Sequence, residues 1–196
     1  GALVALLPLS WVWLRNPQAS TARRVHALTW ITLFITFDLV LFGAFTRLTD
    51  SGLGCPDWPG CYGHASPLGA QAAIAQEQSQ MPSGPVTHTK AWIEMIHRYM
   101  AMAVGGLILT LAAFAWVRRW RGDTTSGVLW PTFTLFWVCV QGAFGALTVT
   151  MKLFPLIVTL HLMGGMVLLG LLTLQVQRHR LMTQRSQSVL LRPWLY

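Results

Sequence analysis

The sequence predicts an all-α integral membrane protein built as a four-helix transmembrane bundle. Hydrophobic residues make up 54% of its 196 residues and charged residues only 10%, which is more apolar surface than a soluble domain of this length could bury. Four uninterrupted apolar stretches are each near the roughly 20 residues that a helix needs to cross a bilayer core. The arginines gather in clusters beside alternate stretches. Composition, segment length and charge placement therefore all indicate membrane spans.

An apolar N-terminal piece precedes the predicted spans. Residues 1–14 are shorter than a span and contain Pro8, and we interpret them as part of a truncated transmembrane helix. A cleaved signal peptide is the alternative, but its charged n-region and small-residue cleavage site are missing. The four full spans cover approximately Ala27 to Leu48, Ala91 to Val117, Leu129 to Thr150 and Leu156 to Val176.

These segments divide the chain into three expected regions. Residues 1–25 form a partial helix and a cytoplasmic linker, and residues 26–177 form the four-helix domain with an external loop at 49–90. Residues 178–196 form a basic cytoplasmic tail.

The net charge of +8 indicates membrane topology, and we expect no nucleic-acid partner. If the spans alternate in direction, all the arginine clusters fall on one side, which the positive-inside rule assigns to the cytoplasm. The loop from Thr49 to Lys90 and the connection from Met151 to Pro155 then lie outside, and they contain two lysines and no arginine. The clusters consist of Arg15, Arg23 and Arg24, of Arg118, Arg119 and Arg121, and of Arg178, Arg180, Arg185 and Arg192.

Two histidines, His97 and His161, lie inside the second and fourth spans. Ionisable side chains are costly in the hydrocarbon core, so their presence there indicates a binding role. Both spans run inward from the outer side, and the histidines lie about six and five residues into them, which corresponds to roughly 8–9 Å of depth. Two imidazoles at one depth are the arrangement needed to hold a planar metal cofactor from both faces.

Glu94 precedes His97 by one helical turn and lies above it, toward the outside. Arg98 stands at the i+4 position from Glu94, so one interpretation is an ion pair that neutralises both charges near the membrane surface. The alternative is a carboxylate held beside the edge of a cofactor, where it accepts a proton or stabilises a cation. Spacing does not choose between these interpretations.

The first span ends in the segment GAFTRLTDSGLGCPDWPGCYG, whose density of Gly, Pro, Asp and Trp predicts an ordered system of turns. Cys55 and Cys61 lie on the oxidising side, which favours a disulfide over a metal site because further ligands of suitable spacing are not evident. The disulfide could be structural or redox-active. Residues 63–89 look loosely structured, with a short helix through 70–80 and exposed His64 and His88 that we do not expect to act as ligands.

Other residues of the spans are interpreted first as packing. Small residues in every span let helices approach closely, and Gly164 and Gly165, one turn beyond His161, are the best candidates for clearance around a cofactor. Asp38 is expected to make a hydrogen bond to a neighbouring helix, with a proton path as the alternative. Cys139 is expected to be an inert apolar filler within the third span.

Three motifs in order resemble the heme A synthase family over roughly Leu28 to Gln177. The segment GAFTRLTDSGLGCPDWPGCYG is similar to the signature after the first core helix of that family, EMIHR is similar to its Glu-x-x-His-Arg motif, and TLHLMGG resembles its histidine-bearing fourth helix. The resemblance implies an oxidoreductase of a bacterial inner membrane. It would bind heme O and oxidise a porphyrin methyl group to the formyl group of heme A, by successive hydroxylations with oxygen from water, for cytochrome oxidase biogenesis.

The resemblance also implies roles for individual residues. His97 and His161 would be the axial ligands of the heme iron, with Arg98 beside them in the heme-binding set. Glu94 would be the catalytic carboxylate, and Cys55 and Cys61 the external disulfide of the family. Members usually contain a second four-helix half that is associated with a heme b and takes electrons away. This chain has one half, which favours a fragment or a half-size form that pairs with itself or with a second subunit, and heme O synthase is another expected partner.

A bis-histidine membrane electron carrier is the main alternative. It would use His97 and His161 without needing Glu94 or the cysteine loop, and it would leave its heme unmodified. A four-span thiol oxidase that passes electrons to quinone would use external cysteines but normally requires a second cysteine pair, which Cys139 alone cannot supply. A purely structural membrane subunit is the remaining alternative.

Overall fold

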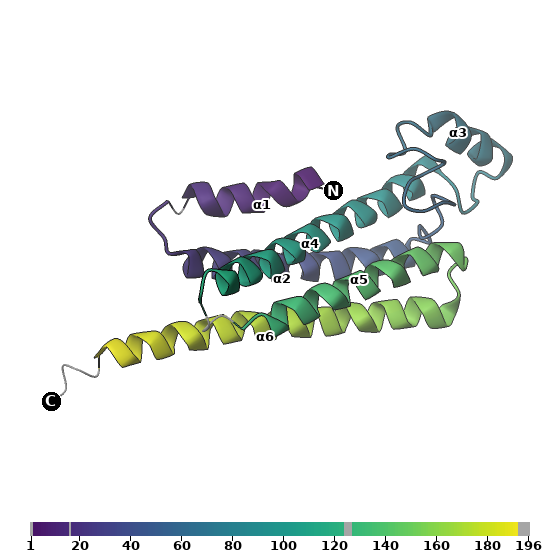
Figure 1. Cartoon of the computed structure of the whole chain (residues 1–196). Helices are drawn as coiled ribbons and strands as arrows, with labels where there is room; N and C mark the ends of the chain where they lie inside the picture. The colour runs from purple at the N-terminus through teal and green to yellow at the C-terminus, as the bar shows by residue number, and fades with distance from the viewer. Residues whose placement is uncertain (1, 16, 124–126, 192–196) are drawn as a thin grey trace.

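The computed structural model describes residues 2–15, 17–123 and 127–191, and in this part of the chain all regular elements are helices (Figure 1). Helices α2, α4, α5 and α6 are long and apolar enough to cross a membrane. The prediction of an all-α, multi-pass membrane protein is therefore confirmed. The helices in chain order are α1 (Ala2–Arg15), α2 (Thr21–Leu48), α3 (Gln71–Gln80), α4 (His88–Trp120), α5 (Leu129–Thr150) and α6 (Pro155–Leu191).

Most helices extend beyond the predicted spans, while α5 has the predicted bounds. The starts of α2 and α4 are set by polar caps that precede the apolar stretches. The Ser20 hydroxyl accepts a hydrogen bond from the Arg23 N–H at 3.4 Å, and the Thr87 hydroxyl accepts one from the Lys90 N–H at 3.2 Å. α6 continues as one helix to Leu191, so residues 178–191 of the predicted tail are a helical continuation beyond the fourth span. α3 confirms the short helix expected in the external loop.

The four long helices form a ring. α2 contacts α4 and α6, and α5 contacts the same two helices, whereas α2 and α5 do not contact each other in the described part of the chain. α2 and α5 are therefore diagonal partners across the bundle. Between them, Val104 and Ile108 of α4 pack with Leu168 and Leu172 of α6 to form an apolar cluster.

Threonines on the buried side of α2 are satisfied within their own helix. Thr29, Thr32 and Thr36 each donate to the carbonyl four residues earlier at 2.7–2.8 Å. Because hydrocarbon offers no alternative partner, this local bonding lets hydroxyl groups lie inside a membrane bundle.

The N-terminal apolar piece is helical and packs on the bundle. α1 runs through Pro8 to Arg15 and lies against α4 and α2 (Figure 1). The Trp13 ring stacks on Phe114 with 5.1 Å between ring centroids. α1 therefore extends the bundle near the far end of α4.

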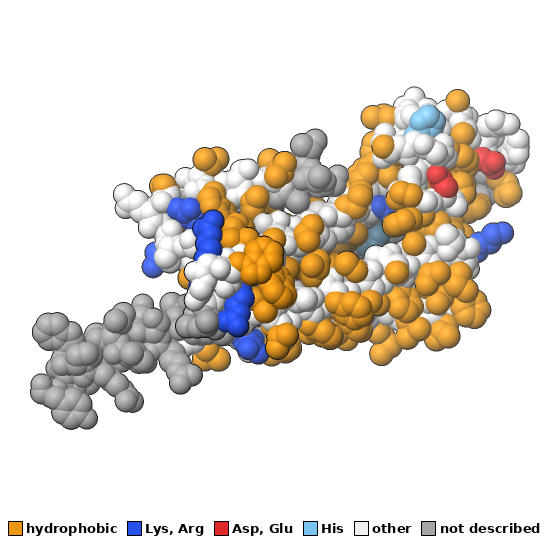
Figure 2. Space-filling model, viewed as in Figure 1, with side chains coloured by type: hydrophobic (Ala, Val, Ile, Leu, Met, Phe, Trp, Pro, Cys, Tyr) orange, Lys and Arg blue, Asp and Glu red, His pale blue; other side chains and the backbone are white. Residues whose placement is uncertain are grey.

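The bundle has two unlike ends. We call the end with residues 49–87 and the α5–α6 turn the loop end, and the opposite end, where α4 stops and α5 begins, the basic end (Figure 1). Lys and Arg side chains gather mainly at the basic end, and hydrophobic side chains cover the face between the two ends (Figure 2). This surface is the one expected of a bundle surrounded by lipid.

Two side chains of the spans are exposed where contacts within the bundle were expected. Cys139 is a free, exposed cysteine on α5, because it stands on the face turned away from the ring, and it fills no core. Asp38 is exposed on α2 and makes no hydrogen bond or ion pair within the described residues, so none of the described helices supplies the expected hydrogen bond. The cause in both cases is helix rotation, which sequence spacing alone does not fix.

Candidate heme-binding site

His97 on α4 and His161 on α6 lie near the loop end, on the two helices that form the other diagonal pair of the ring. Both side chains are half-buried, and their imidazoles are close enough to interact electrostatically. Among the described residues, the Nδ1 atom of each ring is buried without a hydrogen-bond partner. Buried polar atoms are normally paired, so two unsatisfied imidazoles facing one region indicate a site for a ligand.

A glycine lies opposite each imidazole. A methyl group in place of the Gly43 hydrogen on α2 would lie 2.9 Å from His97 Cε1, and one at Gly145 on α5 would lie 3.6 Å from His161 Cε1. Gly43 and Gly145 each stand five residues before the end of their helix, about 7.5 Å from the loop end. This geometry agrees with the equal depth expected for the two histidines.

Gly164 and Gly165, the two glycines beyond His161, pack against side chains of neighbouring helices. A methyl group at Gly164 would overlap the buried side chain of Gln141, and one at Gly165 would touch Val40 at 3.6 Å. The Trp137 indole also donates to the Gly164 carbonyl at 2.9 Å. Gly164 and Gly165 therefore serve helix packing, which was the first interpretation of the small residues in the spans, and these contacts do not support the alternative of cofactor clearance. Gly43 and Gly145 are the glycines that meet the histidines.

The ion pair between Glu94 and Arg98 is present and almost fully buried. Glu94 is 3% exposed and Arg98 is 8% exposed, and the guanidinium donates to one oxygen of the carboxylate. The other Glu94 oxygen accepts a hydrogen bond from the backbone N–H of Cys55 at 2.7 Å. Glu94 therefore joins α4 to the cysteine loop one turn above His97.

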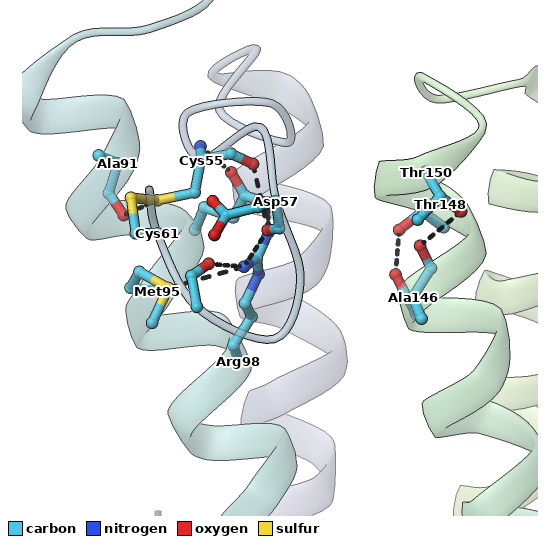
Figure 3. A network of polar contacts seen from close by, with 12 residues as sticks. Cys55, Asp57, Cys61, Ala91, Met95, Arg98, Ala146, Thr148 and Thr150 are labelled. Carbon is cyan, nitrogen blue, oxygen red and sulfur yellow. Dashed lines mark hydrogen bonds and ion pairs between the residues drawn. A yellow bond between two sulfur atoms is a disulfide. The ribbon is translucent and has the colours of Figure 1, made fainter. Parts of the chain in front are cut away.

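Arg98 holds the cysteine loop from inside. Its guanidinium donates to the backbone carbonyls of Asp57 at 2.8 Å, of Gly60, and of Cys55 at 3.4 Å. Figure 3 shows the loop wrapped around the Arg98 side chain as it rises from α4. The sequence predicted the pairing with Glu94 from spacing but not these carbonyl contacts.

Cys55 and Cys61 form the predicted disulfide, with an S–S distance of 2.02 Å and both residues fully buried. The alternative of a metal site at these cysteines is wrong, because both sulfur atoms are bonded to each other. The cysteines pack with Ile74 of α3 and with Ala91 and Met95 of α4. The disulfide thus lies at the centre of a small apolar cluster above the membrane helices.

Gly54 allows the loop to reach α4. A methyl group at Gly54 would lie only 2.4 Å from the Lys90 carbonyl carbon and 2.5 Å from the Ala91 nitrogen. The loop backbone therefore contacts the helix backbone directly, which a side chain at this position would prevent. This close approach brings the Cys55 N–H within reach of Glu94.

Asp57 is a structural residue of the loop that was not singled out from the sequence. Its carboxylate accepts hydrogen bonds from the backbone N–H groups of Tyr62 at 2.6 Å and Gly63 at 2.8 Å. Burial acts to raise the pKa of Asp57, but these hydrogen bonds and the nearby Arg98 outweigh it and hold the pKa below its ordinary value of 3.8. The sequence pattern that could have predicted this role is an Asp at the start of a Pro- and Gly-rich turn.

The two loop histidines lie outside the candidate site. His64 is exposed as expected, and its backbone pairs with Cys61 in an isolated bridge. His88 is half-buried, which differs from the expected exposure, because it begins α4 and its N–H donates to the Gln78 side chain at 3.0 Å. Within the described residues, no group of three or more His, Cys, Asp or Glu side chains could hold a metal ion.

Known proteins resemble the chain over most of its length. A heme A synthase from Shewanella oneidensis is 44% identical over 156 residues, which are 78% of this chain and 46% of that protein. A heme A synthase from Lysinibacillus sphaericus is 29% identical over 151 residues, 74% of this chain and 42% of that protein. The chain thus spans about half the length of the curated relatives it matches. No solved structure matches it significantly.

The region in common includes all the parts of the candidate site. Residues 26–196 match the family described as cytochrome oxidase assembly protein. This range contains the cysteine loop, Glu94 and both histidine-bearing helices. The chain therefore belongs to the cytochrome oxidase assembly protein family, together with proteins named heme A synthase.

Proposed function

We propose that this chain is the substrate-heme half of a heme A synthase, an oxidoreductase that converts the heme O methyl group to the formyl group of heme A. The observation that carries the proposal is the pair of unsatisfied imidazoles, each opposed by a glycine, with a buried carboxylate one turn above His97. The names of the relatives support it.

His97 and His161 are the proposed ligands of the iron of the substrate. The residues of the site suit a heme iron, because neutral imidazole is a common iron ligand and both rings have a nitrogen without a partner in the described chain. Glycine at positions 43 and 145 leaves room for each ring beside α2 and α5, where a side chain would contact the imidazole. The two histidines thus hold the molecule that is changed.

Glu94 is the proposed catalytic carboxylate, and Arg98 is the residue that positions it. The Arg98 guanidinium and the Cys55 N–H both favour the ionised form of Glu94, which can then accept a proton released near the substrate. Arg98 also fixes the loop carbonyls, so carboxylate and loop keep one arrangement. The disulfide is proposed to have a structural role in this arrangement, since it lies in an apolar cluster.

Successive hydroxylations with water as the oxygen source release protons and electrons, so the reaction needs an electron acceptor. We propose that a heme b in a second four-helix unit takes the electrons, supplied by further polypeptide or by another subunit. The loop end is proposed to face the outside of a bacterial inner membrane and the basic end the cytoplasm. Heme O synthase is a proposed source of substrate.

A bis-histidine electron carrier is the second candidate function. The specific observation in its favour is that both Glu94 oxygens already accept hydrogen bonds from the protein, as expected of a purely structural carboxylate. A carrier would bind heme through His97 and His161 and return it unchanged.

The two candidates are separated by supplying heme O and analysing extracted heme by mass spectrometry. The assay uses membranes that contain the protein together with its electron acceptor. We expect hydroxylated and formyl heme with the wild type and a large loss of both with Glu94→Gln, while heme binding is retained. Glu77→Gln, on the exposed face of α3, is the matched control and should be as active as the wild type. Unmodified heme from a fully assembled wild type would favour the carrier.

A further inference from the structure

Asp38 is a carboxylate in the middle of a membrane span on the outer face of the bundle. It stands ten residues before the end of α2, about 15 Å from the loop end and so near the centre of a hydrocarbon core about 30 Å thick. It is the only Asp, Glu, Lys or Arg between Arg24 and Arg47. A lipid-exposed charge at this depth is strongly unfavourable, so such residues normally face protein or water.

The surroundings of Asp38 on α2 are apolar and exposed. Phe34 is 63% exposed, Leu41 is 55% exposed and Phe45 is 45% exposed, and all three lie within two turns of Asp38 on the same side of the helix. We call these four residues the Asp38 face. The face contains no second polar side chain, which is unlike the lining of a water-filled proton path.

The described chain does not cover the Asp38 face. Asp38 has no hydrogen bond or ion pair within these residues, while α4 and α6 pack on other sides of α2, as Gly43 and Val40 show by their contacts with His97 and Gly165. An acceptor on an apolar face requires a partner that brings a donor. The complementary surface is therefore apolar with one donor at mid-span.

We propose that the Asp38 face is a docking surface for a transmembrane helix outside residues 1–196 that presents one Arg, Lys, Asn or Gln side chain to Asp38 at mid-membrane. The length of the relatives supports such a helix, because more than half of the Shewanella oneidensis protein lies outside its match to this chain. The inference stands on Asp38 and its neighbours and does not depend on the heme chemistry.

Site-specific photo-crosslinking in native membranes tests the occupant. A benzophenone amino acid replaces Phe34 or Phe45 on the Asp38 face. In the control it replaces Phe136, which is 60% exposed on the diagonal helix α5. We expect crosslinks from Phe34 and Phe45 to a transmembrane peptide with a donor at the depth of Asp38, identified by mass spectrometry, and none to that peptide from Phe136. Crosslinks to lipid alone, to a helix without a donor, or to a second copy of this chain would overturn the proposal.

Substitution of Asp38 tests the hydrogen bond itself. Asp38→Leu should lower the crosslinking yield about fivefold, as expected for the loss of one intramembrane hydrogen bond, and Asp38→Asn should retain most of it. An unchanged yield with Asp38→Leu would contradict the pairing. Bound heme or helix content confirms that each variant is folded.

Carbodiimide labelling gives a readout that does not depend on crosslinking. Carbodiimides modify carboxyl groups that face lipid, so Asp38 should be protected in the assembled protein. The matched control is Cys139→Asp, because Cys139 is exposed on α5 and lies eleven residues before its end, about 16 Å from the loop end. Labelling of Asp38 as fast as this control would show that the Asp38 face meets lipid and would overturn the proposal.

Discussion

The two ends of the bundle carry similar residues in different surroundings. Each end has a histidine from two different helices, and α4 supplies an arginine in an ion pair to each. At the loop end, His97 and His161 each face a glycine of a neighbouring helix. At the basic end, His26 and His179 contact each other edge-on, with 6.3 Å between ring centroids. The glycines that face His97 and His161 therefore distinguish the loop-end pair as the ligand candidates.

The arginines differ in the same way. The side chains of Arg98 and Glu94 are 9% and 5% exposed, whereas those of Arg118 and Asp123 are 30% and 29% exposed. Arg98 also donates to three loop carbonyls, whereas Arg118 pairs with Asp123, three residues after the end of α4. Burial and long-range bonding make the loop end the more rigid of the two.

The largest expected effect comes from removing a histidine at the loop end. His97→Ala or His161→Ala should abolish the low-spin heme absorbance and lower the heme content at least about tenfold, because a proposed iron ligand is lost. His26→Ala and His179→Ala, at the basic end, should leave the spectrum unchanged. The measurement is absorbance and heme content of the purified protein. A normal spectrum in both loop-end variants would break the distinction between the two pairs.

The second effect concerns stability. Arg98→Gln should lower the free energy of unfolding by about 3–5 kcal/mol, because it leaves Glu94 buried with its charge unpaired. Arg118→Gln should cost about 0–1 kcal/mol, because that pair is partly solvated. Denaturant titration of the heme-free protein in one detergent measures both. Equal losses would show that burial does not distinguish the two ion pairs.

The third effect separates the two glycines at the loop end. Gly43→Ala should weaken heme binding about five- to tenfold. The new methyl group would lie 2.9 Å from His97 Cε1, which is too close, so the His97 ring would have to move. Gly145→Ala should change binding little, since 3.6 Å from His161 Cε1 is an ordinary van der Waals contact. Heme titration by absorbance gives both affinities. If the two variants bind alike, the imidazole positions are not set by these contacts.

The membrane spans could be predicted from the sequence because lipid imposes one simple rule, an apolar run of sufficient length. α5 has the predicted bounds for this reason, while α2 and α4 begin earlier because their first turns are polar and capped by Ser20 and Thr87. The pairing of Glu94 with Arg98 could also be predicted from the sequence, because residues four positions apart share one face of a helix.

Contacts between segments could not be predicted in this way. Glycine occurs in every span, and only the rotation of α2 and α5 in the ring determines that Gly43 and Gly145 meet the histidines while Gly164 meets Gln141. The bonds from Arg98 to Asp57 and Gly60 join residues about forty positions apart, so no local pattern reports them. The exposure of Asp38 and Cys139 could not be predicted for the same reason, because hydrophobic spans carry little information about which face is turned outward.

The smallest expected effect is a pH dependence that belongs to the loop end alone. The pKa of Asp57 in the folded protein lies below its ordinary value of 3.8, so the stabilisation from its hydrogen bonds to Tyr62 and Gly63 is complete above that value. It is lost as the pH falls through the lower, folded pKa, because the protonated carboxyl is a weaker acceptor. The amide protection factors of Tyr62 and Gly63, corrected for intrinsic exchange, should therefore stay constant at higher pH and fall only below about 3.8.

Asp57→Asn should lower these protection factors at all pH values and remove most of their pH dependence, since the amide oxygen accepts hydrogen bonds more weakly and does not titrate. Asp50→Asn is the matched control, because the Asp50 side chain is 72% exposed and pairs with Lys90 at 3.3 Å without holding the turn. A fall in protection that persists in Asp57→Asn would assign the pH dependence to another group. Protection that rises on acidification would contradict the sign, because a carboxyl with a lowered pKa can only lose stabilisation when it is protonated.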